Sequence, residues 1–157
     1  MFKPNVTVAC VVEAQNRFLL VEEEILGESV FNQPAGHLEK NESIIDAAQR
    51  ELFEETGLNL TPQFLVGTYL YPVARENLTF LRLCFGLRLT EAITAPPVDT
   101  QIKACHWFTL EDIIQRQAQL RSPMVLRCIK DFRRGQQYDL GQFHYLPERS
   151  IAGAPGM

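Results

Sequence analysis

Apolar and polar residues alternate along two stretches near the N-terminus, Asn5–Ala14 and Arg17–Glu24. Alternation with a period of two is typical of a β-strand with one buried face. The polar pair Gln15-Asn16 lies between the two stretches and is suited to a tight turn. The pattern therefore predicts a β-hairpin, and one face of its first strand is formed by Val6, Val8, Cys10 and Val12.

Further strands are predicted on the same grounds in the middle of the chain. They are a short strand and loop over Val30–His37, strands over Phe64–Ala74 and Leu78–Thr90 separated by a polar turn at Arg75-Glu76-Asn77, and a strand over Lys103–Phe108. A proline-rich loop over Thr94–Pro97 precedes the last of these.

Two helices are predicted after the last strand. Thr109-Leu110-Glu111-Asp112 resembles a capping box, which predicts a helix continuing to about Gln117. Ser122 is suited to cap a second helix and Pro123 to its first turn, and this helix is expected to reach about Arg134.

Another helix is predicted over Ser43–Thr56, where apolar residues recur at spacings of three and four. The apolar stripe consists of Ile44, Ile45, Ala48 and Leu52. Asn41 or Ser43 can serve as its N-cap, and Gly57 stands where a left-handed residue would end it.

Three glutamates of this helix, Glu51, Glu54 and Glu55, are spaced so that their carboxylates converge on one face. Like charges at this spacing destabilise an isolated helix, and a bound cation removes the repulsion. Hard ions such as Mg²⁺ take oxygen ligands, so a carboxylate cluster suits them. The adjacent Arg50 can hold a carboxylate in a bidentate pair.

The segment GHLEKNESIIDAAQRELFEETGL adds Gly36, Glu42 and Gly57 to these acids at fixed spacings. The acidic run alone would most often be a solvated helix face, but the complete pattern indicates a cation site. It matches G-x5-E-x7-R-E-U-x-E-E-x-G-U, in which U is aliphatic, without a departure. The chain therefore resembles the Nudix hydrolase family.

This resemblance implies an α/β/α sandwich with a mixed sheet and a loop-helix-loop catalytic motif. It implies hydrolysis of a nucleoside diphosphate linked to another group, with Mg²⁺ or Mn²⁺. The metal site would be formed by Gly36, Glu51, Glu54 and Glu55. Glu51 or Glu54 would be the catalytic base, Arg50 would orient a glutamate, and Glu42 would support the site.

The phrases MFKPNVTVACVV, FNQPAGHLE and LRSPMV also resemble the NudJ phosphatase subgroup of this family, across nearly the whole chain. The subgroup implies a permissive site for nucleoside tri- and diphosphates and thiamine-type pyrophosphates. One alternative is a MutT-like house-cleaning pyrophosphohydrolase acting on nucleoside triphosphates. Another is a non-catalytic Nudix-fold nucleotide sensor, which would be expected to have lost an acid of the motif, and none is missing.

Substrate contacts are expected outside the motif. Candidates are Gln33 with Asn32, Phe31 as a stacking wall, His37 as a phosphate-orienting group, and Arg82, Arg75 or Arg88 as a pyrophosphate clamp. Each has a structural alternative, such as backbone satisfaction for the amides and core packing for Phe31. Trp107 is expected to be core. Asp99, Glu76 and Glu111 are possible additional ligands or bases, and the sequence does not choose among them.

At 157 residues with 46% hydrophobic and 22% charged residues, the chain is expected to form one domain over 1–157, with about 150–157 frayed. The net charge of −4 argues against a nucleic-acid-coating surface. No apolar run approaches the roughly 20 residues of a membrane span, and no signal-peptide pattern precedes the first strand. We expect a monomer or homodimer acting on a small-molecule nucleotide or pyrophosphate.

The four cysteines, Cys10, Cys84, Cys105 and Cys128, show no C-x-x-C pair. Three lie in apolar strand-like or helical contexts, which favours reduced, buried thiols in a cytoplasmic protein. The histidines have no ligand spacing with them, so a zinc site is not expected.

Overall fold

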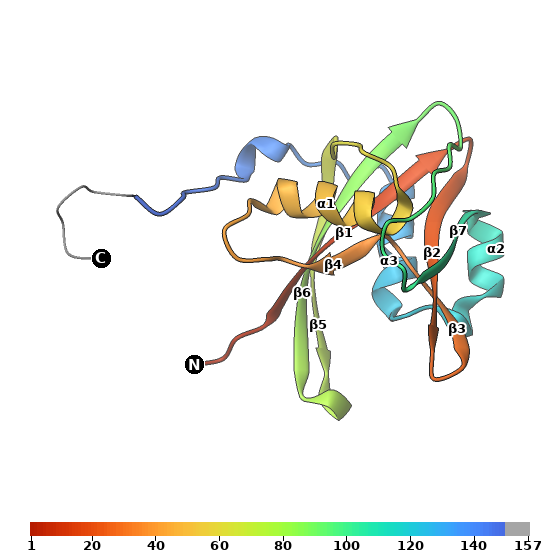
Figure 1. The fold of residues 1–157 in the computed structure, drawn as a ribbon, viewed down its shortest axis with the longest axis horizontal. Helices are drawn as coiled ribbons and strands as arrows, with labels where there is room; N and C mark the ends of the chain where they lie inside the picture. Colours follow the sequence, from red (N-terminus) through yellow and green to blue (C-terminus); the bar gives the residue numbers. More distant parts are fainter. Residues whose placement is uncertain (150–157) are drawn as a thin grey trace.

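The computed structural model describes residues 1–149, within which strands form a central sheet with helices on both faces (Figure 1). The predicted fraying of 150–157 lies outside the described residues. The strands are β1 Asn5–Ala14, β2 Arg17–Ile25, β3 Glu28–Asn32, β4 Ala35–His37, β5 Phe64–Val73, β6 Leu78–Leu89 and β7 Ile102–Thr109. The helices are α1 Ile44–Thr56, α2 Leu110–Gln115 and α3 Pro123–Arg133, and short 3-10 turns cover Ala74–Glu76, Gln117–Gln119 and Leu140–Gln142.

The sheet is mixed, with the order β3-β2-β1-β6-β5, and β4 pairs with β1 while β7 pairs with β2. β1 and β6 run parallel over ten residue pairs, and the other pairings are antiparallel. Since β1 lies in the middle of the sheet, it is buried on both faces. The sequence pattern predicted one apolar face for this strand, and the second buried face, which includes Ala9 and Val11, was missed.

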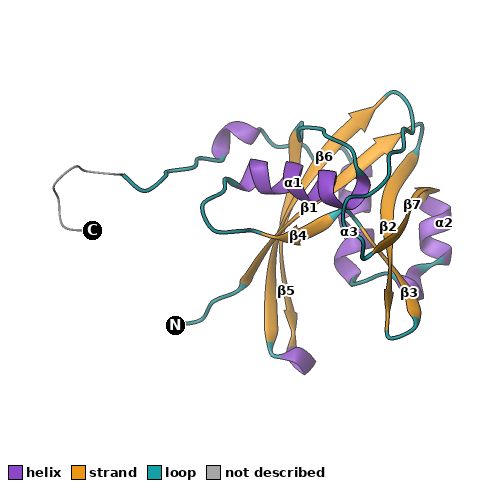
Figure 2. Ribbon diagram, viewed as in Figure 1, coloured by secondary structure: helices purple, strands orange, loops and turns teal. Residues whose placement is uncertain are grey.

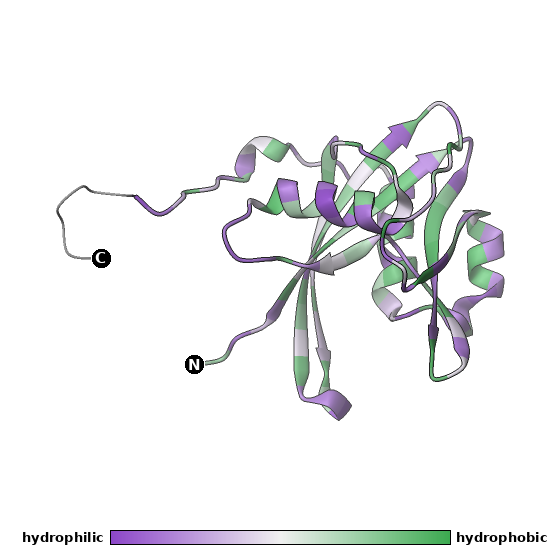
Figure 3. Cartoon of the chain, in the orientation of Figure 1, coloured by the Kyte–Doolittle hydropathy of each residue, from purple (hydrophilic) through white to green (hydrophobic). Residues whose placement is uncertain are grey.

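Helices on the two faces of the sheet form the predicted α/β/α sandwich (Figure 2), and one hydrophobic core lies on each face. On one face α1 packs Ala47, Ala48 and Leu52 against β1 and β6. On the other face the core residues of α3 are Val125, Leu126, Cys128, Ile129 and Phe132. Hydrophobic and hydrophilic residues alternate along α1 and α2 (Figure 3), as expected of helices with one buried side.

Most predicted turns and caps are confirmed. Gln15 and Asn16 both have positive φ, 51° and 62°, and close the β1–β2 hairpin. Thr109 and Asp112 form the predicted capping box at the start of α2. Ser122 caps α3 with Pro123 in its first turn. The helix predicted to continue to Gln117 ends at Gln115, and a 3-10 turn follows it.

The region predicted as one strand and loop, Val30–His37, forms two separate strands. The interruption falls at Gln33 and Pro34, since proline has no N–H to continue a ladder and its carbonyl accepts instead from the Cys10 N–H at 3.0 Å. As a result β3 pairs with β2, whereas β4 pairs with β1. The segment before α1 therefore contributes one strand beside β2 and a second strand beside β1.

A buried carboxylate fastens α3 to the edge strand β5. Asp131 is 1% exposed, and its carboxylate accepts from the Tyr69 hydroxyl at 2.7 Å and from Arg127 Nε at 2.9 Å. It also accepts from Arg134. Burial alone would raise the pKa of Asp131, but these donors outweigh it and lower the pKa below its ordinary value.

The four cysteines are free, and Cys10, Cys84 and Cys128 are buried as predicted. Cys105 is half-buried, and its thiol lies 3.3 Å from the Glu55 carbonyl. No helix in residues 1–149 is long and apolar enough to cross a membrane.

The Asp131 cluster leads to a prediction about stability. Asp131→Asn should lower the free energy of unfolding at pH 7 by about 1.5–3 kcal/mol, because a charged acceptor is lost from buried hydrogen bonds. The folded-state pKa is depressed, so this stabilisation is present above the unfolded pKa of about 3.9 and is lost as pH falls through the folded value. Urea unfolding at a series of pH values measures it.

The matched control is Asp46→Asn, at an exposed position in the first turn of α1. This variant should change stability by about 1 kcal/mol or less. A difference between wild type and Asp131→Asn that stays the same from pH 7 to pH 2 would contradict the assigned role.

Candidate active site on the glutamate helix

Helix α1 begins and ends where the sequence predicted. The Ser43 hydroxyl accepts from the Asp46 N–H at 3.0 Å, so Ser43 rather than Asn41 is the cap. Gly57 ends the helix with φ 75°, a left-handed conformation that favours glycine. Leu52 is fully buried beneath the helix, and Arg50 links Glu51 and Glu54 to Glu42 in the loop before the helix.

The approach of α1 to β4 is very close at Gly36. A Cβ placed on Gly36 would lie 2.1 Å from the carboxylate carbon of Glu51, far inside van der Waals contact. The glycine of the motif therefore leaves room for the Glu51 carboxylate and is not needed for an unusual φ. One turn further on, the Glu55 carboxylate accepts from the Ala35 N–H at 2.8 Å. Two acids of the helix are thus set against the strand backbone.

Arg50 connects the carboxylates of the motif. Its Nε and Nη2 form a bidentate pair with Glu42 at 2.9 and 2.8 Å, and Nη1 donates to Glu51 at 2.8 Å and to Glu54 at 3.3 Å. Nη2 also donates to the His37 carbonyl at 3.0 Å. The predicted roles of Arg50 and Glu42 fit this geometry. The hydrogen bond to Arg50 lowers the pKa of Glu42, and the same pair raises the pKa of Arg50.

Glu55 and Glu51 are the carboxylates least able to keep their charge unaided. Burial, together with nearby Glu51, Glu23 and Asp99, raises the pKa of Glu55 to about 8. Glu55 is 7% exposed, and no cation forms an ion pair with it among residues 1–149. Burial also raises the pKa of Glu51, against the opposing effect of Arg50. A divalent cation beside these two carboxylates would stabilise their charged forms.

Two acids from outside the motif belong to this region. The Val98 and Asp99 N–H groups donate to the Glu54 carbonyl at 2.9 and 2.7 Å, which fastens the loop before β7 to the helix.

Of the three extra acids considered from sequence, only Asp99 is brought here, since Glu76 lies in the β5–β6 turn and Glu111 on α2. Glu23 of β2 was missed, although its place in the alternation after Leu19 and Val21 puts it on the α1 face.

The donor set fits a divalent metal ion. In residues 1–149 no three acidic, histidine or cysteine side chains are already grouped to hold a metal ion, and Glu51 and Glu54 are hydrogen-bonded to Arg50. Carboxylate oxygens and a closely approached glycine backbone are nevertheless the ligand types that Mg²⁺ and Mn²⁺ prefer. The buried and mutually repelling acids around Glu55 lack a positive charge that such an ion supplies.

Three of the predicted substrate contacts form one buried network. Arg82 donates to the Gln33 side-chain oxygen at 2.8 Å and to the Asn32 oxygen at 3.2 Å. Gln33 in turn donates to the Val125 carbonyl at 2.7 Å. Gln33 is 1% and Arg82 4% exposed. The Gln33 amide therefore serves to position Arg82 and α3, and is not free to meet a ligand as the sequence suggested.

The aromatic predictions have different outcomes. Phe31 is 6% exposed and makes edge-on contacts with His106 and Phe108, so the expectation of a stacking wall is wrong and the ring is core. The physical reason is that β3 pairs with β2 and turns this side chain inward. Trp107 packs against the core on the α1 face, and its indole N–H donates to the Ile93 carbonyl, which supports its predicted structural role.

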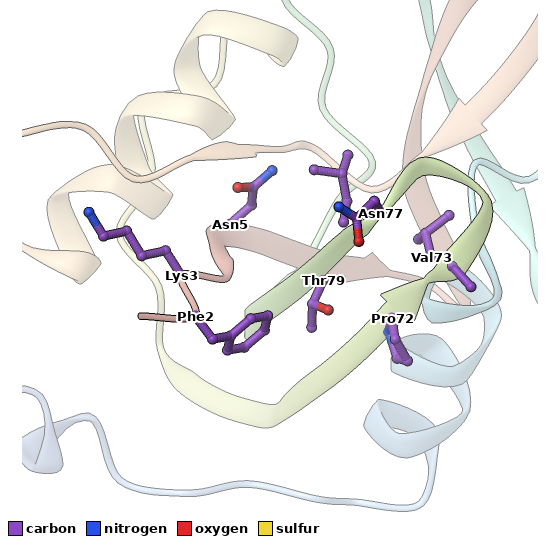
Figure 4. A pocket seen from close by; sticks show the side chains of 9 residues that line it. Phe2, Lys3, Asn5, Pro72, Val73, Asn77 and Thr79 are labelled. Carbon is purple, nitrogen blue, oxygen red and sulfur yellow. The ribbon is translucent and has the colours of Figure 1, made fainter.

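The remaining candidates lie at different distances from the acids. His37 is an exposed residue of β4, directly beside Gly36. Arg88 lies over the Phe132 ring at 4.4 Å, a structural contact. Arg75 is in the turn beyond β5, near a hollow of about 260 Å³ between Phe2–Asn5 and the β5–β6 hairpin (Figure 4). None of the predicted site residues lines that hollow.

Comparisons with known proteins identify the family of this chain. The NUDIX domain model matches residues 1–128. A phosphatase NudJ from Escherichia coli is 44% identical over 148 residues, covering 92% of this chain and 95% of the relative. The structure of a NUDIX hydrolase from Nitrosomonas europaea is 42% identical with a TM-score of 0.85, covering 92% and 98% of the two chains.

A more distant neighbour shares the fold alone. The MutT protein from Methanosarcina mazei Go1 is 19% identical with a TM-score of 0.68, and the match covers 87% of this chain and 99% of that one. With an unbroken motif on α1 and matches over most of the chain, the protein belongs to the Nudix family and is a hydrolase acting on phosphorus-containing anhydrides.

Proposed function

We propose that this enzyme uses a divalent metal ion to hydrolyse the phosphoanhydride bonds of nucleoside tri- and diphosphates and of thiamine-type pyrophosphates. The observation that carries the proposal is the set of acids on α1, with Glu51 pressed against Gly36 and Glu55 buried among other carboxylates. The 44% identity to a phosphatase NudJ supports a substrate range of the NudJ type over others in the family.

In this proposal each residue has a distinct task. Glu51, Glu54 and Glu55 would hold Mg²⁺ or Mn²⁺ together with the Gly36 backbone. The ion supplies charge neutralisation at the diphosphate and lowers the pKa of a bound water. Arg50 fixes the directions of Glu51 and Glu54 through its two hydrogen bonds. A glutamate not fully engaged in coordination then takes the proton of the attacking water.

Glu51 and Glu54 are both suited to be that base. The Glu54 side chain is 40% exposed and that of Glu51 14%, so Glu54 is the more accessible to water. Burial raises the pKa of Glu51, which favours this carboxylate as a proton acceptor. The assignment stays open between them, and separate Gln variants distinguish the two roles.

The cellular setting forms part of the proposal. The four free thiols support a reducing cytoplasm as the place where the enzyme acts. We propose a monomer or homodimer that binds small-molecule substrates. The chain has a net charge of −4, which does not favour binding to a nucleic acid polymer.

A MutT-like pyrophosphohydrolase of non-standard nucleoside triphosphates is the second candidate. The structural neighbour of that name shares 19% identity and therefore supports the fold but not the substrate. The discriminating experiment is a substrate panel with the products resolved as phosphate or pyrophosphate.

We predict that purified protein with Mg²⁺ hydrolyses several common nucleoside triphosphates and thiamine or hydroxymethylpyrimidine pyrophosphate. ADP-ribose and dinucleoside polyphosphates should be poorer substrates, because the NudJ-type range favours small compounds. The measurement is kcat/KM for each compound. A strong preference for ADP-ribose, or for one oxidised nucleotide over all others, would contradict the proposed substrate range and leave the hydrolase assignment intact.

A second prediction concerns the metal. Excess EDTA should abolish turnover, and Mg²⁺ should raise Tm in the absence of substrate, because an ion that binds only the folded state stabilises it by mass action. Differential scanning fluorimetry with and without Mg²⁺ measures the shift. Turnover that persists undiminished in EDTA would be incompatible with the metal assignment.

Third, Glu54→Gln and Glu55→Gln should each lower kcat by about 10²–10⁴ while the protein stays folded, since each removes a charge from a crowded acidic face. Glu111→Gln, on the exposed side of α2, is the matched control and should retain full activity. For Glu51→Gln, lost kcat with unchanged metal affinity supports the base role. A folded Glu54→Gln, Glu55→Gln double variant with near wild-type activity would refute these roles.

A further inference from the structure

The bend between β3 and β4, Asn32–Ala35, has few backbone hydrogen bonds of its own. β3 pairs with β2 as far as Asn32, and β4 pairs with β1 from Ala35, so Gln33 and Pro34 lie outside both strand ladders. Pro34 has no N–H, and its carbonyl accepts from the Cys10 N–H at 3.0 Å. Side-chain contacts can therefore decide the path of the chain through this bend.

The end of the bend determines where two acids of α1 lie. The Ala35 N–H donates to the Glu55 carboxylate at 2.8 Å. At the next residue, Gly36, the absence of a side chain leaves the space that the Glu51 carboxylate occupies. Both carboxylates thus depend on the backbone position of β4, and a shift of the bend would move them.

Arg82 of β6 holds the bend from the side of α3. Its Nη1 donates to the Gln33 side-chain oxygen at 2.8 Å, and its Nη2 donates to the Asn32 side-chain oxygen at 3.2 Å. Because the Gln33 oxygen faces the guanidinium, its amide nitrogen points to α3 and donates to the Val125 carbonyl at 2.7 Å. One chain of hydrogen bonds therefore runs from β6 through the bend to α3.

The charge of Arg82 is an expensive way to make this contact. Arg82 is 4% and Gln33 1% exposed, and no carboxylate in residues 1–149 forms an ion pair with the guanidinium. Burying an unpaired charge is unfavourable, although hydrogen bonds from a charged donor are stronger than neutral ones. Buried charged groups are often replaceable by apolar residues without loss of stability. Stability alone therefore does not account for a cation at this position.

We propose that Arg82 and Gln33 are positioning residues for the acids of α1. Arg82 orients the Gln33 amide, and Gln33 fixes the bend against α3. The bend in turn presents the Ala35 N–H to Glu55 and leaves room for Glu51. Neither Arg82 nor Gln33 needs to touch the substrate or a metal ion for this role. The inference rests on the proposed function, because it takes Glu51 and Glu55 as metal ligands.

A role in the stability of the fold alone is the alternative, and a second contact of α3 provides the comparison. The Tyr69 hydroxyl of β5 donates to the Asp131 carboxylate of α3 at 2.7 Å. Like the contact of Gln33, this hydrogen bond fastens α3 to the sheet, but it does not involve the bend. Tyr69→Phe therefore shows what the loss of an anchor of α3 does by itself.

The first measurement is amide hydrogen exchange of the metal-free protein, followed by NMR. Gln33→Met keeps the approximate volume of the side chain and removes both of its hydrogen bonds. Exchange of the Ala35 amide should become at least about tenfold faster relative to that of the Leu65 amide, which is bonded to Tyr138 outside the bend. In Tyr69→Phe the ratio of the two rates should stay within about twofold of the wild-type ratio.

The second measurement is the affinity for Mn²⁺, determined by titration calorimetry without substrate. Gln33→Met should bind Mn²⁺ about 10- to 100-fold more weakly, a loss typical of variants that remove the support of a metal ligand. Tyr69→Phe should bind within about twofold of wild type, although both variants should lower Tm by about 3–10 °C. Asn32→Ala removes only the longer hydrogen bond to Arg82 and should weaken Mn²⁺ binding about 2- to 5-fold.

The outcomes separate positioning from stability and from the proposed function. A folded Gln33→Met variant that keeps the wild-type exchange ratio or the wild-type Mn²⁺ affinity would overturn the inference, and so would equal losses in Tyr69→Phe. If Gln33→Met does not fold, Asn32→Ala takes its place, and an unchanged Ala35 exchange ratio in that variant overturns the inference. If Ala35 exchange is faster in Gln33→Met but wild type binds no Mn²⁺, the control of the bend by Gln33 is supported and the proposed function fails.

Discussion

The contact on which the site depends is the close approach of α1 to β4. The Glu51 carboxylate occupies the space that a side chain at residue 36 would fill, so only glycine lets this carboxylate lie so near the strand. The same approach brings the Ala35 N–H to Glu55. The position of α1 is fixed by its cap Ser43, by its end at Gly57 and by the apolar contact of Leu52, and this position maintains the contact with β4. The geometry of the acids is therefore set by backbone packing and not by flexible side chains alone.

Charge balance divides the acids into two groups. Arg50 reaches Glu42, Glu51 and Glu54 and gives them a positive neighbour. Glu55 has no such partner in residues 1–149, and burial together with nearby acids raises its pKa to about 8. In the proposed mechanism a metal ion would supply the missing positive charge, which would couple ion binding to the ionisation of the site. Arg50 therefore orients Glu51 and Glu54, whereas Glu55 carries the deficit of positive charge that the proposed metal ion would fill.

The sequence was sufficient to predict those features of the structure that depend on the spacing of nearby residues. Short-range rules predicted the helix caps Ser43 and Ser122 and the ends of the first hairpin. The spacing of the motif also predicted which acids lie together on α1. Contacts between distant segments were not predictable in this way. Glu23 and Asp99 reach the site through the pairing of β2 and the docking of a loop on α1, and Arg82 meets Gln33 across 49 residues. Phe31 was misjudged because its inward direction depends on the pairing of β3 with β2.

The most direct test of this account is the affinity of Gly36→Ala for Mn²⁺, measured by titration calorimetry without substrate. The added methyl meets the mobile end of Glu51, so the variant should fold with stability within about 1 kcal/mol of wild type. Its Mn²⁺ affinity should fall at least about tenfold, a loss of 1.4 kcal/mol, because Glu51 is displaced. Gly141→Ala, in the 3-10 turn Leu140–Gln142 outside the motif, should bind as wild type does. A folded Gly36→Ala variant with unchanged Mn²⁺ affinity would contradict the account.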